Sequence, residues 1–388
     1  MSATVASVGV IARPLLVGVL ALAGLSQLAA INNDLLAAAG SKHAPARADL
    51  QARLAQTPYD QAALRGLASA DRQNGNATSA HALLTLAGRL GWRDSQTELM
   101  LLEDAVRQGD ANAAMRHIDA LLRRKPDLAP RLMPALHAMA TDKVGRNALL
   151  VRLESSPPWR KEFFTRIDFI PAQYQAVHET LLSELAKTGK PAGAEEISSY
   201  VAALARQGEV GRARKLWTTL TDTKPGLVLD PEFERFDPGS SVPAPSPFEW
   251  NASRLPGTEL RITVEAGTPS SRDLVVDTDG SAHGTVLAQA LVLKPGRYRL
   301  FVATPSTTVL AAGGLKWTVR CLPGSKTIST GGAAVALGWQ SDFEVPAMGC
   351  AVQRLSLEAR RADALTVGEA RFEKVWALPL AGSGGPLS

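Results

Sequence analysis

The spacing of apolar side chains changes once along the chain, near residue 250. Between residues 46 and 224, Ala and Leu recur every three or four positions, which is the period of an amphipathic helix. Beyond residue 250, apolar and polar side chains alternate, as in "TELRITVEAG" (258–267) and "GRYRLFVA" (296–303), which is the period of a strand. The pattern therefore predicts a helical region followed by a sheet region.

The alternating segments are short, and turn sequences such as "KPG" and "AAGG" separate them. The predicted strands cover residues 258–267, 272–277, 284–293, 296–303, 314–321, 328–337, 340–345, 350–358 and 371–378, and the strand at 284–293 is apolar on both faces, as in a central strand. Short strands at this spacing are typical of an antiparallel β-sandwich. We place the sandwich at residues 250–380 and expect a flexible tail at 381–388. The predicted fold class is multidomain, α then β.

One stretch near the start of the chain is apolar and carries no charge. Residues 14–31, "PLLVGVLALAGLSQLAAI", nearly span a ~30 Å hydrocarbon layer at a helical rise of ~1.5 Å per residue. A cleaved secretory signal needs a basic start, whereas Arg13 is the single basic residue before this run. We expect an N-terminal transmembrane helix, with a cleaved signal as the open alternative. Residues 1–13 are then cytoplasmic, and the chain is a single-pass protein of the bacterial inner membrane with its bulk in the periplasm.

The helical region contains an internal repeat. "RQNGNATSA" (72–80) aligns with "RQGDANAA" (107–114) at an offset of 34 residues, and 107–126 aligns with 206–225 at an offset of 99, close to three such units. A period of 34 residues with paired helices resembles the tetratricopeptide family. The resemblance implies a helical-repeat domain over residues 46–228 with a surface that binds a protein partner. "SSPPWR" (155–160) interrupts the pattern, so the number of repeats is left open.

A proline-rich stretch, "DPEFERFDPGSSVPAPSPFEW" (230–250), separates the two regions. Proline has no backbone N–H and stops both helix and sheet. We therefore expect an extended, semi-rigid linker at residues 229–249.

The chain contains two cysteines, Cys321 and Cys350. In an exported protein we expect them to form a disulfide, with two buried free thiols as the alternative. The alternation in "LKWTVRC" points Trp317 and Cys321 into the sandwich. Around Cys350 the alternation is less regular, which indicates either a bulge near residue 353 or a strand that starts after Cys350. No CxxC spacing is present, so zinc binding by these cysteines is not indicated.

The order of elements in the sheet region carries a second resemblance. "AQALVLKPGRYRLFVATP", followed by "WTVRC", "FEVP" and a second cysteine, resembles jelly-roll modules of the carbohydrate-binding kind. The resemblance implies that exposed aromatic rings, flanked by hydrogen-bonding side chains, contact a glycan. Trp317 is excluded because its parity points it into the core. The candidate glycan contacts are Arg297, Arg299, Phe301 and Trp339.

Charge and motifs exclude several other classes of function. A net charge of +5 is small for 388 residues, and no segment is dominated by Lys and Arg, which disfavours nucleic acid as a partner. "HETLL" (178–182) lacks the second histidine of a zinc-peptidase helix, and no GxSxG sequence is present. We therefore expect no enzymatic activity, no metal and no cofactor.

These expectations combine into one functional hypothesis. The chain is predicted to be a scaffold of the bacterial cell envelope, with a protein-binding helical region and a sandwich that contacts polysaccharide in exopolysaccharide or cell-surface assembly. The alternative is a protein–protein adaptor of a secretion or envelope complex that does not bind glycan. An aromatic face on the sandwich favours the first hypothesis, and a smooth charged face favours the second.

Overall fold

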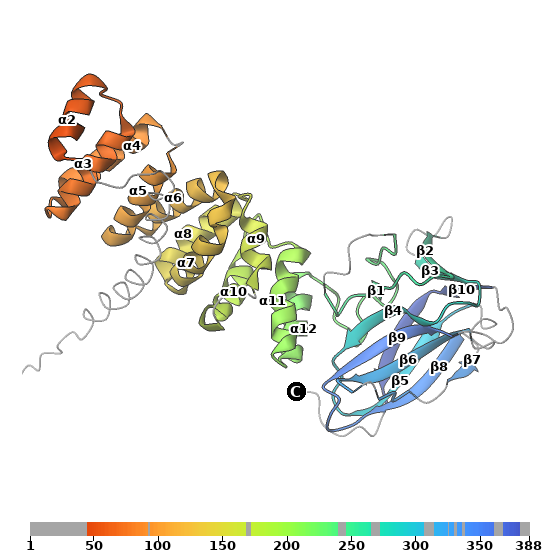
Figure 1. The fold of residues 1–388 in the computed structure, drawn as a ribbon. Coiled ribbons are helices and arrows are strands. Elements are labelled where there is room, and N and C mark those ends of the chain that lie inside the picture. Colours follow the sequence, from red (N-terminus) through yellow and green to blue (C-terminus); the bar gives the residue numbers. More distant parts are fainter. Residues whose placement is uncertain are drawn as a thin grey trace, which may run out of the picture. The chain divides into compact units, whose positions relative to one another are not determined.

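The helices precede the sheets, as the sequence predicts (Figure 1). The computed structural model describes residues 45–91, 94–167, 172–239, 246–264, 272–305, 314–324, 326–329, 332–335, 338–360 and 368–380. They form two compact units that divide between Ala192 and Gly193. The predicted cytoplasmic start (1–13), membrane helix (14–31) and tail (381–388) lie outside the described residues. Within the described ranges, no helix combines the length and the hydropathy needed to cross a membrane.

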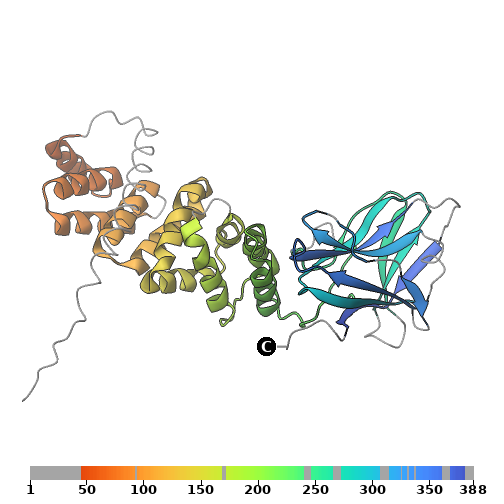
Figure 2. The same cartoon turned by 90° about the horizontal axis from the view of Figure 1, so that it is seen from below.

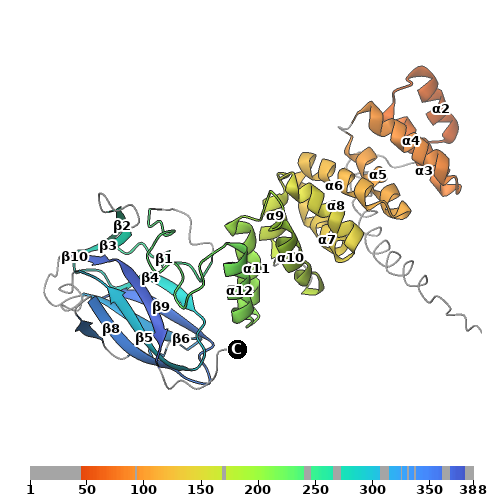
Figure 3. The same cartoon turned by 180° about the vertical axis from the view of Figure 1, so that it is seen from behind.

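The first unit consists of helices that pack against their neighbours in the chain (Figure 3). Its helices are α2 (Arg47–Gln56), α3 (Gln61–Gln73), α4 (Ala77–Leu90), α5 (Ser95–Gln108), α6 (Ala111–Arg124), α7 (Ala129–Thr141), α8 (Lys143–Glu154), α9 (Arg160–Thr165) and α10 (Ala172–Leu185), with a 3₁₀ turn at Pro126–Leu128. Acidic and amide side chains start several of them. The side chains of Asp60, Asn76 and Asp110, for example, each accept a hydrogen bond from a backbone N–H in the first turn.

The internal repeat corresponds to equivalent turns between paired helices. The turns before α4, α6 and α12 (Val210–Leu220) each contain a glycine with positive φ, at Gly75 (79°), Gly109 (71°) and Gly208 (84°). This conformation favours glycine because a Cβ atom is strained there. The alanines that follow, Ala80, Ala114 and Ala213, are buried, so the repeated small residues are packing positions.

The interruption at residues 155–160 contributes buried side chains to the first unit. Trp159 is buried, and its indole Nε1 donates to Asp119 Oδ1 at 2.9 Å. The guanidinium of Arg160 donates to the carbonyl oxygens of Leu153 (2.8 Å) and Pro191 (2.9 Å). The side chains of Trp159 and Arg160, where the helical pattern is interrupted, therefore form hydrogen bonds that connect separate segments of the unit.

The second unit contains α11 (Ala194–Arg206), α12 and three antiparallel sheets (Figure 2). The strands are β1 (Asn251–Ala252), β2 (Thr258–Val264), β3 (Arg272–Thr278), β4 (Gly284–Leu291), β5 (Gly296–Ala303), β6 (Leu315–Leu322), β7 (Ala333–Val335), β8 (Gly338–Val345), β9 (Val352–Ala359), β10 (Gly368–Phe372) and β11 (Lys374–Pro379). Their orders are β1-β4-β9-β6, β10-β3-β2 and β11-β5-β8-β7. The sheets share one core, in which Trp317 lies edge-on to Trp250 (5.9 Å) and to Phe372 (5.6 Å). This arrangement is sandwich-like, as the alternation predicts.

The composition predicts an extended linker at residues 229–249, whereas the described part of this segment packs on the sandwich. Phe233 and Phe248 are fully buried, and Phe233 and Phe236 belong to the sandwich core. Gln289 of β4 donates to the carbonyl oxygen of Leu229 (2.8 Å) and accepts from its N–H (2.9 Å). Proline prevents regular structure in this segment, but its apolar side chains still gain free energy from burial.

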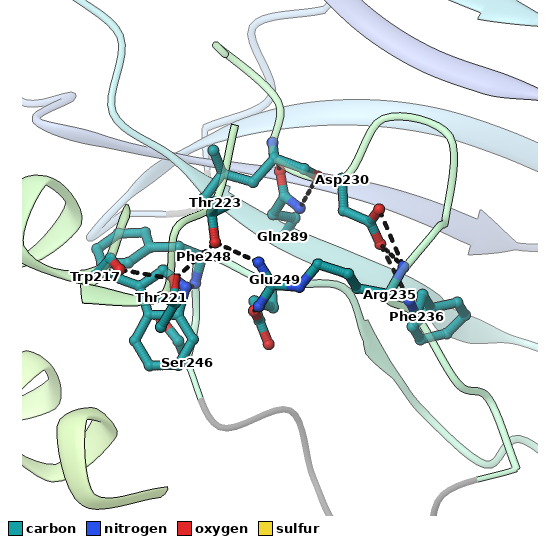
Figure 4. A network of polar contacts seen from close by, with 11 residues as sticks. Trp217, Thr221, Thr223, Asp230, Arg235, Phe236, Ser246, Phe248, Glu249 and Gln289 are labelled. Carbon is teal, nitrogen blue, oxygen red and sulfur yellow. Dashed lines mark hydrogen bonds and ion pairs between the residues drawn. The ribbon is translucent and has the colours of Figure 1, made fainter. Parts of the chain in front are cut away.

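A polar network joins this segment to the end of α12 (Figure 4). The guanidinium of Arg235 contacts Thr223 Oγ1 and donates to Glu249 Oε1 at 2.5 Å. The carboxylate of Asp230 accepts from the backbone N–H of Arg235 and of Phe236, both at 3.1 Å. Burial raises the pKa of both Asp230 and Glu249. The described part of the segment is therefore held by side-chain contacts and not by regular secondary structure.

Cys321 and Cys350 form a disulfide in this unit. Their Cα atoms are 4.8 Å apart, and both residues are buried. Strand β9 begins at Val352, after Cys350, so the irregular alternation reflects the start of the strand. Gln353 faces the core and donates to the carbonyl oxygen of Cys350 at 2.6 Å.

Candidate functional site

The outer face of the β11–β5–β8 sheet carries three of the four predicted glycan contacts. On β5, Leu300 and Val302 point into the core, so Arg297, Arg299 and Phe301 lie on the opposite face. The antiparallel register places them opposite Glu344, Asp342 and Gln340 of β8, respectively. Residues paired in this way project from the same side of a sheet.

The fourth predicted contact, Trp339, lies on the other side of the sheet. Its register partner is Val302, which is buried in the core. The indole of Trp339 packs against that core and against Gly332. One residue of register separates Trp339 from Gln340, and this single step moves the side chain to the inner face. The structure therefore does not bring Trp339 together with the other three residues.

A residue that the sequence reasoning missed, Trp376 of β11, completes the outer face. Trp376 pairs with Phe301, and the two rings stack with centroids 5.0 Å apart and planes 10° apart. Both rings are only partly buried. Lys374 Nζ lies 5.8 Å from the centroid of the Trp376 ring and 2.5 Å from Glu232 Oε1. The signal for Trp376 was present in "KVWALP", where Val375 and Ala377 point into the core.

A charged pair lies beside the aromatic stack. Arg299 donates to Asp342 through Nε (2.5 Å to Oδ1) and Nη2 (2.8 Å to Oδ2). These hydrogen bonds hold the pKa of Asp342 below its ordinary value and raise that of Arg299. Arg297, at the end of the row, is exposed and makes no ion pair with any described residue. We call the surface formed by Arg297, Arg299, Phe301, Gln340, Asp342 and Trp376 the aromatic face.

The aromatic face combines apolar rings with groups that donate and accept hydrogen bonds. The amide of Gln340 lies directly across from Phe301 and can do both. No three His, Cys, Asp or Glu side chains of the described residues are grouped so that they could hold a metal ion. Rings and hydrogen-bonding groups of this kind are able to contact a ligand that has both apolar patches and hydroxyl groups.

A comparison with protein-family models and a comparison with curated proteins both find no match for this chain.

Proposed function

We propose that the chain is a non-enzymatic scaffold of the bacterial cell envelope that binds polysaccharide through the aromatic face. The supporting observation is the partly exposed stack of Phe301 and Trp376 between hydrogen-bonding side chains. In this proposal, residues 14–31 anchor the chain in the inner membrane and the bulk lies in the periplasm. The helix pairs act as tetratricopeptide-like repeats that bind a protein partner, and the biological setting is exopolysaccharide or cell-surface assembly.

Contact with a sugar is more favourable for the rings of Phe301 and Trp376 than contact with water. The outer face of a β-sandwich is ordinarily polar, and partly exposed aromatic rings leave apolar surface in contact with solvent. The C–H side of a pyranose ring is apolar, so a sugar placed against Phe301 and Trp376 removes that surface from water. The jelly-roll resemblance of the sandwich supports the same class of ligand.

The polar groups beside the rings then determine the orientation of the bound sugar. Gln340 lies across from Phe301, and the Arg299–Asp342 pair lies two residues further along the strands, on the same face. Amide, guanidinium and carboxylate groups together offer donors and acceptors to the hydroxyls of a sugar. Because Arg299 and Asp342 fix each other, they are already ordered before a ligand arrives, which lowers the entropic cost of binding.

Affinity electrophoresis of the full chain through gels that contain soluble polysaccharides tests this proposal. The panel should include neutral β-glucans, chitin-type polymers and an acidic exopolysaccharide. We expect Trp376→Ala and Phe301→Ala each to lower the affinity measured by retardation about five- to thirtyfold, since about 1–2 kcal/mol of aromatic contact is lost. Tyr59→Ala, which removes an exposed aromatic ring in the first unit, is the matched control and should leave retardation unchanged.

The adaptor alternative predicts a different result. If no polysaccharide retards the chain, or if Trp376→Ala and Tyr59→Ala migrate like the wild type in every gel, the glycan proposal fails. If both aromatic-face variants then lose a protein partner that the wild type retains in crosslinked membranes, the face is a protein–protein contact.

A further inference from the structure

A groove in the first unit is lined by three consecutive helices. It has a volume of about 470 Å³, within the range of small-ligand and peptide sites. From α4 come His81, Thr85 and Arg89, at the four-residue spacing of one helix face. The remaining lining residues are Gly88 of α4, residues of α5 and α6, and Asp110 at the start of α6, and they include no Phe, Trp or Tyr. The groove therefore lacks the large Phe, Trp or Tyr rings on which nucleobases or sugars most often stack.

The carboxylates of the groove are already engaged by groups of the protein itself. Glu98 lies 2.7 Å from His117 Nδ1 and 3.6 Å from the guanidinium of Arg124. Asp104 lies 2.5 Å from His81 Nδ1 and accepts from Gln108 at 2.8 Å.

The third carboxylate, that of Asp110, is engaged with the backbone. It caps α6 by accepting from Ala113 N at 2.9 Å. Each of these three acidic side chains is therefore engaged by a hydrogen bond or ion pair within the fold.

Two arginines that line the groove form no ion pair within the part of the chain that the structure describes. Arg89 of α4 and Arg116 of α6 both line the groove, both are exposed, and neither makes an ion pair with any residue that the structure describes. The helices that carry them both pack against α5. Guanidinium groups at such positions present paired N–H donors that match a carboxylate.

We propose that this groove binds an acidic peptide segment of a partner protein, with Arg89 and Arg116 pairing to its carboxylates. The inference rests on the proposed function of the helical region as a protein-binding surface and specifies the chemistry of the partner. A groove of this size holds a short extended segment and excludes a folded domain. Because Glu98 and Asp104 are engaged within the fold, fewer carboxylate oxygens are left there for basic side chains of a partner.

Fluorescence anisotropy of the full chain with three labelled peptides of equal length tests the inference. One peptide is rich in Asp and Glu, the second replaces these residues with Asn and Gln, and the third replaces them with Lys. We expect the acidic peptide to bind at least tenfold more tightly than the neutral one, and its affinity to fall as salt is raised. The double variant R89Q/R116Q should lose at least tenfold in affinity for the acidic peptide.

The matched control is R107Q, which removes an exposed arginine of α5 that does not line the groove. Its affinity for the acidic peptide should equal that of the wild type. Equal binding of the acidic and neutral peptides, a preference for the Lys peptide, or wild-type affinity in R89Q/R116Q would each overturn the inference. If the Lys peptide or the neutral peptide binds instead, the acidic-peptide inference fails, but the proposal that the helical unit binds a protein partner is retained. Glycan binding through Trp376 is read out separately, so the two proposals fail independently.

Discussion

Lowering the pH from 7 to 5 should destabilise the first unit through two histidines in its core. His137 of α7 and His178 of α10 are fully buried, and their rings stack with centroids 4.8 Å apart. Phe163 of α9 stacks on His137 at 4.2 Å. His137 Nδ1 donates to the carbonyl oxygen of Met133 at 2.6 Å, which requires no positive charge. Burial lowers the pKa of His137 to about 4, and burial together with repulsion from His137 lowers that of His178 to about 3.

The size of the effect follows from proton linkage. In the unfolded chain both imidazoles titrate near pH 6.5, so between this pH and the folded pKa values the unfolded state binds more protons. Each histidine then lowers the free energy of unfolding by up to about 1.4 kcal/mol per pH unit. The stability is fully present above pH 6.5 and is lost as the pH falls. At pH 5 the two histidines together lower the free energy of unfolding by about 3–4 kcal/mol. This is a large part of the free energy of unfolding of a typical domain, which is about 5–15 kcal/mol.

Urea titrations of the full chain at pH 7 and pH 5, followed by circular dichroism at 222 nm, measure this loss. The variant H137F/H178F keeps the stacked rings but cannot be protonated, so its helical transition should lose about 3–4 kcal/mol less than that of the wild type. H283Q, which replaces an exposed histidine of the second unit, should behave like the wild type. If H137F/H178F shows the same pH dependence as the wild type, the buried histidines do not control acid stability.

Two further predictions concern the second unit. Cys321→Ser and Cys350→Ser should each lower its unfolding free energy by about 3–4 kcal/mol, and the double variant should cost little more, because either change opens the same loop with a sequence separation of 29. Urea unfolding by tryptophan fluorescence without reductant measures this, and single variants as stable as the wild type would contradict it. Gln289→Ala should cost about 2–4 kcal/mol, since it leaves the buried N–H and C=O of Leu229 unpaired. The exposed substitution Glu344→Ala is its control, and equal melting temperatures for the two would contradict this assignment.

The periods of the sequence predicted the helical and sheet regions because each period is a local property. The alternation in "LKWTVRC" placed Trp317 and Cys321 in the core, where the structure has them. The predicted strand at 371–378 is instead two strands, β10 and β11, in different sheets. A pattern of alternation alone does not show which sheet a strand joins.

The linker and the aromatic face were harder to predict because they depend on contacts between distant residues. Phe233, Phe248 and Trp250 were visible within the proline-rich stretch, yet only their neighbours in the folded chain show that they are buried. The pairing of Trp376 with Phe301 requires the register of β11 against β5, across more than seventy residues of sequence. The alternation along β5 indicated the correct face for Phe301. Its ring partner, Trp376, is determined by which strand pairs with β5, and the alternation does not show this.

The central claim is that the aromatic face binds a glycan, and fluorine NMR of the full chain labelled with 5-fluorotryptophan tests it most directly. The chain contains seven tryptophans, and a Trp376→Phe variant assigns the resonance of interest. On titration with a polysaccharide that retards the chain in gels, the account predicts a saturable shift or broadening of the Trp376 resonance, while that of the buried Trp317 stays in place. A titration in which Trp376 does not respond, while binding is detected by retardation, would contradict the assignment of the site.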